Sequence, residues 1–100
     1  MKILITTQYR ENYGTESDPY WKFKGGSDYF IPGVDPLKVA PGVLVERVRD
    51  QIEHAGPMSE EYILDWQLVE DDALSPYEQD QLLLDGGVQY SAKVLELETV

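Results

Sequence analysis

Two stretches in the first third of the chain have the period of two that is typical of β-strands, and a third is a short apolar run. The predicted strands are residues 1–7, 20–24 and 29–31. The polar segment 8–18, which contains Asn12 and Gly14, is expected to be a loop. The run Gly25-Gly26-Ser27-Asp28 predicts a hairpin-like turn between the second and third strands.

From Gly42 to Ala55 the apolar residues recur with the period of an α-helix, and Gly56-Pro57 is expected to end it. The stripe expected to be buried is Leu44, Val45, Val48 and Ile52. The opposite face carries Glu46, Arg47, Asp50 and Glu53.

Residues 62–69 fit two patterns. As a strand, the segment places Tyr62, Leu64, Trp66 and Leu68 on one face; as a helix starting near Ser59, it groups Ile63, Trp66 and Val69. Its length and aromatic content favour the strand.

The clearest local signal is the start of a second helix at Ser75-Pro76-Tyr77-Glu78. It combines an N-cap serine, proline at the first helical position and glutamate three residues after the cap. The helix is expected to run to about Asp85 and to end at Gly86-Gly87.

A last strand is predicted from the alternation of Val88, Tyr90, Ala92 and Val94. Leu95 and Leu97 shift the apolar phase by one residue, which indicates a bulge near Val94. The expected fold is a single α+β domain, residues 1–100, with element order β-β-β-α-β-α-β. We expect a mainly antiparallel sheet of about five strands with two helices on one face.

The net charge of −11 comes entirely from the second part of the chain. Residues 1–38 hold five basic and five acidic residues, whereas residues 39–100 hold three basic and 14 acidic ones. Such a surface repels nucleic acid and attracts basic proteins. No cysteine is present, which excludes disulfides and thiol chemistry. With no apolar stretch of membrane-spanning length, a cytoplasmic protein is expected.

Catalytic and metal-binding motifs do not stand out. The one histidine, His54, falls at the end of the predicted long helix, where a solvated role is the ordinary one. Glu70-Asp71-Asp72 and the acids Glu78, Asp80 and Asp85 lack the ligand order of a calcium loop. We therefore expect a protein that is not an enzyme and has no catalytic residue, metal or cofactor.

Aromatic and basic residues interleave in the second strand, Tyr20-Trp21-Lys22-Phe23-Lys24. This pattern can stack bases and pair phosphates, and it defines an alternative nucleic-acid site of Arg10, Tyr13, Lys22 and Lys24. The favoured interpretation is structural, with Trp21 and Phe23 facing the core and the lysines facing solvent. Direct nucleic-acid binding is also disfavoured by the net charge.

The acidic residues support a different hypothesis. Carboxylates spaced along a surface can imitate duplex phosphates and occupy the basic groove of a nucleic-acid enzyme. The residues expected to bind such a partner are Glu46, Asp50, Glu53, Glu70, Asp71 and Asp72.

The segments Thr7-Gln8-Tyr9-Arg10-Glu11-Asn12-Tyr13-Gly14 and Tyr20-Trp21-Lys22-Phe23-Lys24-Gly25-Gly26 resemble small uncharacterised proteins of tailed bacteriophages. A looser match lies around Asp65-Trp66 and Glu78-Gln79-Asp80-Gln81-Leu82. The resemblance carries over no functional residue. It implies the host cytoplasm and a role in binding and inhibiting host machinery, including defence nucleases.

The expected function is that of a non-enzymatic acidic protein that inhibits or modulates a host or defence protein with a basic surface. Two alternatives stay open: a small nucleic-acid-binding accessory protein, and a structural or assembly component. The structural alternative predicts self-association, for instance as a homodimer, through an apolar patch or a free strand edge such as residues 88–98.

Overall fold

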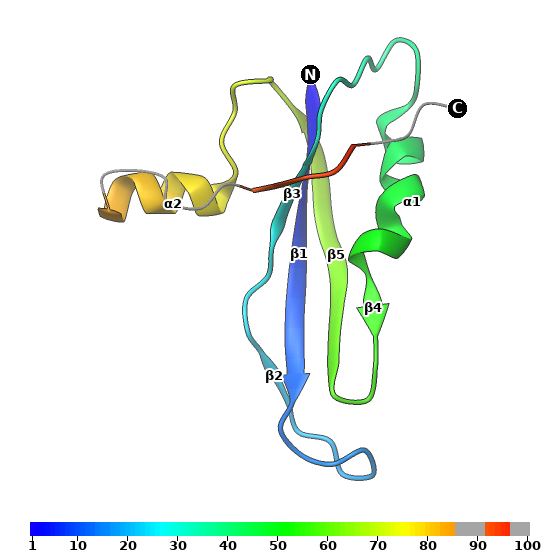
Figure 1. The fold of residues 1–100 in the computed structure, drawn as a ribbon, viewed down its shortest axis with the longest axis vertical. Coiled ribbons are helices and arrows are strands. Elements are labelled where there is room, and N and C mark those ends of the chain that lie inside the picture. The colour runs from blue at the N-terminus through cyan, green and yellow to red at the C-terminus, as the bar shows by residue number, and fades with distance from the viewer. Residues whose placement is uncertain (86–91, 97–100) are drawn as a thin grey trace.

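The computed structural model describes residues 1–85 and 92–96, and Figure 1 shows how its elements are arranged. In chain order these are β1 (Lys2–Asn12), β2 (Trp21–Phe23), β3 (Asp28–Ile31), α1 (Pro41–Ile52), β4 (His54–Ala55), β5 (Ser59–Val69), α2 (Pro76–Asp85) and β6 (Lys93–Val94). Within the described residues no helix is long and apolar enough to cross a membrane.

One sheet joins all six strands in the order β4-β5-β1-β3-β6, and β2 pairs with β1 next to β3. All pairs are antiparallel except β3 with β6, which is parallel. The α+β prediction is therefore confirmed. The predicted element order is corrected by the added strand β4, and the sheet is mixed because β6 returns parallel to β3.

The main core lies between α1 and one face of the sheet. Ile3 and Ile5 of β1, the central strand, are fully buried there. The predicted helix stripe faces them and is confirmed as buried: Leu44, Val45, Val48 and Ile52. The 3.6-residue period of that stripe places it along one side of α1, which is why the helix packs flat on the strands.

α1 ends earlier than predicted. The helix stops at Ile52, and Glu53 is already extended, with φ −82° and ψ 136°. His54 and Ala55 then pair with Glu61 and Glu60 of β5. The prediction of a helix up to Ala55 was wrong because the backbone groups of this last segment bond to a neighbouring strand instead of to the helix.

α2 has the predicted start. The backbone N–H of Ser75 donates to the Glu78 carboxylate at 3.0 Å, and the N–H of Glu78 donates to the Ser75 hydroxyl at 3.2 Å. This reciprocal pair is a capping box. In Figure 1, α1 lies beside β5 while α2 extends away on the other side of β1 and β3. The two helices thus do not form the single layer that was predicted.

β1 is longer than its apolar pattern predicted. It continues through the polar residues 8–12, which were expected to be a loop. Residues on both neighbouring strands pair with this part: Arg10 lies opposite Phe23 of β2 on one side and Glu60 of β5 on the other. Pairing on both edges satisfies the backbone groups and stabilises a strand that local propensity disfavours.

β2 and β3 do not form the predicted hairpin, since both pair with β1 along the same edge. Arg10 pairs with Phe23 and Thr6 with Asp28, so four steps along β1 match five steps along the partner. The extra residue is a bulge at Gly25-Gly26. Gly25 has φ +95°, and a Cβ on Gly26 would overlap the Thr7 carbonyl oxygen, so this bulge requires both glycines.

β5 confirms the strand interpretation of residues 62–69, but not its single apolar face. Thr6 pairs with Asp65 and Thr7 with Ile63, so Leu64 is an extra residue in β5. Because this bulge reverses the alternation, Trp66 lies on the face of Ile63. Leu64 is 61% exposed.

β6 contains only Lys93–Val94, and the Leu95 N–H donates to the Phe30 carbonyl. The predicted helix end at Gly86-Gly87 and the strand positions Val88, Tyr90 and Leu97 lie outside the described residues.

Candidate functional site

One end of the sheet extends beyond α1, as the lower part of Figure 1 shows. It consists of the second half of β1, β2 and the start of β5, together with the loop of residues 13–20. We call this part the distal end. Tyr13, Tyr20 and Phe23 are exposed here by 51%, 60% and 62%. Large aromatic side chains that are exposed together are typical of protein-binding surfaces.

The first face of the distal end carries a connected set of tyrosines and lysines around Glu11, which we call the tyrosine–lysine surface. It comprises Tyr9, Glu11, Tyr13, Tyr20, Lys22 and Lys24. The hydroxyls of Tyr9 and Tyr13 each donate to the Glu11 carboxylate at 3.0 Å. The Lys24 ammonium lies 4.9 Å from the centre of the Tyr13 ring, and the Lys22 ammonium lies 5.6 and 5.5 Å from the rings of Tyr13 and Tyr20.

These contacts change the acid–base behaviour of two groups. The hydrogen bond to the Glu11 carboxylate raises the pKa of the Tyr9 phenol. The neighbouring Tyr13 hydroxyl raises the pKa of the Lys24 ammonium. Both shifts keep the groups in their ordinary protonation states at neutral pH, so the surface presents two lysines and three phenols around one carboxylate.

The opposite face of the distal end carries Arg10, Trp21 and Phe23. The Arg10 guanidinium lies 4.3 Å from the centre of the half-buried Trp21 ring, and its Nε donates to the Glu60 carboxylate of β5. Arg10 is thus held between an aromatic ring and an acid. Its charge is compensated by Glu60.

Buried Asn12 fixes the loop that carries the exposed tyrosines. Its Oδ1 accepts from the N–H groups of Gly14 and Tyr20 at 2.8 and 2.9 Å. Its Nδ2 donates to the carbonyls of Thr15 and Pro57 at 3.2 and 3.0 Å. One carboxamide therefore closes the 13–20 loop and ties it to the turn before β5.

The structure brings together three of the four residues of the predicted nucleic-acid site. Tyr13, Lys22 and Lys24 share the tyrosine–lysine surface, whereas Arg10 lies on the other face. The expectation that Phe23 belongs to the core was wrong: Phe23 pairs with Arg10 at the distal end, away from the buried part of the sheet, and is 62% exposed. Tyr20 belongs to the aromatic and basic segment that the sequence indicated, and Tyr9 joins the same surface through Glu11.

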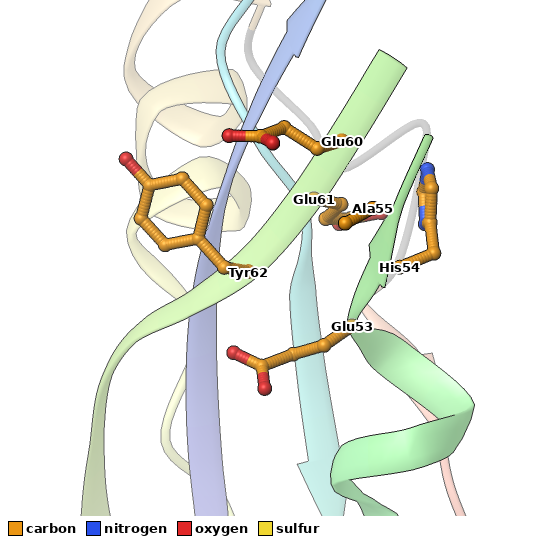
Figure 2. A pocket seen from close by; sticks show the side chains of 6 residues that line it. All are labelled: Glu53, His54, Ala55, Glu60, Glu61 and Tyr62. Carbon is orange, nitrogen blue, oxygen red and sulfur yellow. The ribbon is translucent and has the colours of Figure 1, made fainter. Parts of the chain in front are cut away.

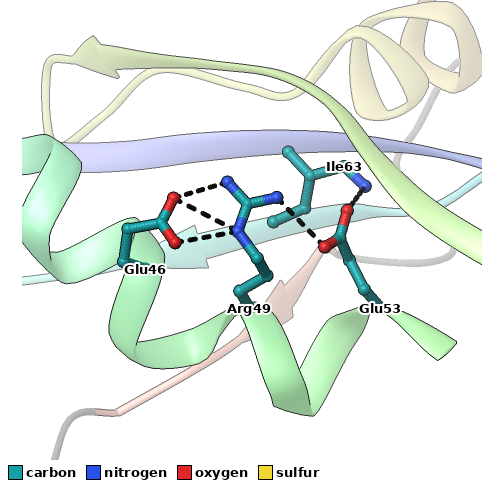
Figure 3. A network of polar contacts seen from close by, with 4 residues as sticks. All are labelled: Glu46, Arg49, Glu53 and Ile63. Atoms are coloured by element: carbon teal, nitrogen blue, oxygen red, sulfur yellow. Dashed lines mark hydrogen bonds and ion pairs between the residues drawn. The ribbon is translucent and has the colours of Figure 1, made fainter.

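The acidic residues of α1 are tied to one cation, as Figure 3 shows. Arg49 contacts Glu46 at 2.6 Å and Glu53 at 3.0 Å, and the second Glu53 oxygen accepts from the Ile63 N–H at 2.8 Å. The hydrogen bond from Ile63, followed by Arg49, lowers the pKa of Glu53, and Arg49 lowers the pKa of Glu46. Asp50 is exposed on the same helix.

The other predicted acids, Glu70, Asp71 and Asp72, follow the end of β5 and are all exposed. Asp71 contacts the N-terminal ammonium of Met1 at 3.1 Å. They lie at the end of the sheet opposite to the distal end, so the six predicted acids form two groups, one on α1 and one after β5.

A hollow of about 320 Å³ lies beside the β4–β5 pair. Figure 2 shows that its side chains diverge: Glu60 and Tyr62 point to one side of β5, and His54 points to the other. The His54 ring lies 6.4 Å from Tyr9 and is exposed. His54 lies opposite Glu61 of β5, and the Glu61 carboxylate accepts a hydrogen bond from the Thr7 hydroxyl at 2.6 Å.

A second hollow of about 260 Å³ lies between the start of β3 and α2, lined by Gly26, Ser27, Asp28, Tyr77, Ala92 and Lys93. Asp28 accepts from the Tyr77 N–H at 3.2 Å, so a carboxylate of the chain itself occupies the first turn of α2. Among the described residues no group of three acidic or histidine side chains is placed to hold a metal ion.

No protein-family model, curated protein or solved structure matches this chain.

Proposed function

We propose that this protein works by binding another protein, without catalysis, and that the distal end of the sheet is its main contact surface. The observation that carries this proposal is a connected set of exposed aromatic side chains held in fixed positions. Rings that are already ordered lose little conformational entropy when a partner covers them. Tyrosine, tryptophan and arginine are also the residues that dominate binding energy at protein interfaces.

The charge of the distal end favours a protein over nucleic acid. Residues 8–24 and 59–62 hold three basic and five acidic side chains, a net charge of −2. Phosphate binding needs net positive charge, whereas a protein surface can match mixed charges.

The acidic remainder of the surface is proposed to speed association with a basic partner. Asp50 and the group after β5 contribute most, because Glu46 and Glu53 share one arginine. The resemblance to bacteriophage proteins supports a host or defence protein as the partner, which the complex would inhibit or modulate.

The test is capture of a protein from nuclease-treated host lysate by three forms of the tagged protein. These are the unmodified chain, the double variant Tyr20→Ala/Phe23→Ala, and the control Leu37→Ala, which removes a side chain that is 95% exposed far from the distal end. We expect one protein to be retained by the first and third forms and to be lost with the double variant. Equal capture by all three would contradict this assignment of the surface.

A matched variant tests the electrostatic part of the proposal. Glu70→Lys/Asp71→Lys/Asp72→Lys should slow association at low salt and have little effect at high salt. An association rate that is unchanged at low salt would show that these acids do not steer the partner.

A second candidate is binding of single-stranded nucleic acid to the tyrosine–lysine surface. The observation that favours it is the exposure of Tyr13 and Tyr20 beside two lysines. Fluorescence anisotropy with a labelled single-stranded oligonucleotide distinguishes the two functions. Binding at physiological salt that Lys22→Glu/Lys24→Glu abolishes would establish this candidate, and no binding at that salt would exclude it.

A further inference from the structure

β5 has an open edge. On its inner edge it pairs with β1 over its whole length, but on its outer edge it pairs with β4 only at Glu60 and Glu61. Among the described residues no backbone hydrogen bond reaches the outer edge of residues 62–69. We call this segment the β5 edge. It is long enough to pair with a typical strand of five or six residues.

Two N–H groups on the β5 edge already hold carboxylate oxygens. The Ile63 N–H donates to Glu53 at 2.8 Å, and the Trp66 N–H donates to Asp65 at 2.8 Å. A neighbouring strand would place its carbonyl oxygens at about the same distance from these groups. The two carboxylates therefore stand where the acceptors of a further strand would lie.

The surroundings of the β5 edge are acidic and partly apolar. The contacts among Glu46, Arg49 and Glu53 lie between α1 and β5, beside Ile63, as Figure 3 shows. Two carboxylates share the one arginine there, and Asp65 adds a further exposed acid. The exposed apolar side chains of the edge are Leu64 at 61% and Trp66 at 38%.

We propose that the β5 edge accepts an extended segment of a basic partner protein as an added strand, with basic and apolar residues alternating along it. Asp65 pairs with Thr6 and Trp66 with Ile5, so the two side chains lie on opposite faces of β5. The basic side chains of the added strand would lie on the face of Asp65, and the apolar ones would lie on the face of Trp66. The backbone carbonyls would replace the carboxylate oxygens at Ile63 and Trp66. Strand addition of this kind obtains affinity from the backbone and specificity from alternate side chains.

A second copy of this chain is a poor occupant of the same edge. A twofold antiparallel pair over residues 62–69 would bring Glu61 and Glu60 of one copy near Glu70 and Asp71 of the other, and each chain has a net charge of −11. Like charges that face each other across a strand pair are destabilising. The inference rests on the proposed protein-binding function, and the edge adjoins the distal end at Glu60 and His54, so one partner can cover both.

The test is an NMR titration of the full chain with an eight-residue capped peptide of alternating lysine and valine. We expect shifts and slower hydrogen exchange for the amides of Ile63, Trp66 and Leu68. Two control peptides keep the length: one replaces lysine by glutamate, and one has its four central amides N-methylated. Each should bind at least tenfold more weakly, a change of about 1.4 kcal/mol.

Variants of the protein complete the test. Leu64→Lys places a cation on the edge and should weaken binding of the lysine–valine peptide about tenfold, or 1.4 kcal/mol, whereas Leu37→Lys should leave it unchanged. Equal binding of the N-methylated peptide, or no effect of Leu64→Lys, would overturn the proposal, since attraction would then be electrostatic without strand pairing. Because the signals come from β5 amides and a defined peptide, this failure is distinguishable from failure of lysate capture at the distal end.

Discussion

The two ends of β1 lie in opposite environments within one strand. At its start, Ile3 and Ile5 are fully buried beneath α1. Towards its end, Tyr9 and Glu11 belong to a surface that no helix covers, and their neighbours are held by hydrogen bonds and cation–π contacts. The comparison teaches that the covered end supplies stability, while the uncovered end presents large side chains in fixed positions for a partner.

The largest change in the free energy of unfolding is expected from a cavity at the covered end of β1. Ile5→Ala should lower the free energy of unfolding by about 2–5 kcal/mol, because it leaves a cavity in the central strand. Tyr13→Ala at the uncovered end should change it by less than about 0.5 kcal/mol. Urea denaturation followed by circular dichroism measures both. Similar losses in the two variants would mean that the distal end contributes to the core after all.

A smaller effect is expected at the bulge that separates the faces of β2 from those of β3. Gly26→Ala places a Cβ against the Thr7 carbonyl and should cost about 1–3 kcal/mol through overpacking. The matched control is Gly56→Ala, whose Cβ would be in ordinary contact at 3.5 Å from Ser59. Urea midpoints of the two variants decide this, and an unchanged midpoint for Gly26→Ala would contradict the tight register at Thr7.

Asn12→Ala tests whether the uncovered end of β1 can be destabilised without affecting the covered end. Removal of the carboxamide leaves the N–H groups of Gly14 and Tyr20 without their acceptor and should cost about 1–2 kcal/mol. Hydrogen exchange should accelerate at these two amides, while that of Ile5 keeps its protection. Equal acceleration at Ile5 would show that the two ends open as one unit.

The smallest expected effect is the pH dependence of the contact between α1 and β5. Because the pKa of Glu53 is lower in the folded protein than its ordinary value of 4.5, its contribution is present above 4.5 and is lost as the pH falls through the folded pKa. Wild type should exceed Glu53→Gln in stability by about 1 kcal/mol at pH 7. Urea denaturation at pH 7 and at lower pH measures the difference, which should shrink as the pH falls through the folded pKa. A difference that stays constant with pH would mean that the Glu53 carboxylate is not its source. Asp50→Asn, at an exposed position of the same helix, serves as the control.

Features that depend on neighbours along the chain could be predicted from the sequence. The buried stripe of α1 follows from the spacing of Leu44, Val45, Val48 and Ile52, and the start of α2 follows from the Ser75–Glu78 capping box. The aromatic and acidic compositions were also evident, including the alternation of rings and lysines in residues 20–24. Helix periodicity and capping are local interactions, so a window of a few residues contains them.

Only the tertiary structure decided which side chains are exposed together. The polar second half of β1 is a strand because β2 and β5 pair with its two edges, and two bulges, at Gly25-Gly26 and at Leu64, set which face each later residue occupies. Because of these registers, Arg10 and Lys22 lie on opposite faces of the sheet, and the Ile63 N–H donates a hydrogen bond to the Glu53 carboxylate. Pairing register and helix cover arise between residues far apart in the chain, and a shift of one residue reverses every face, so no local pattern determines them.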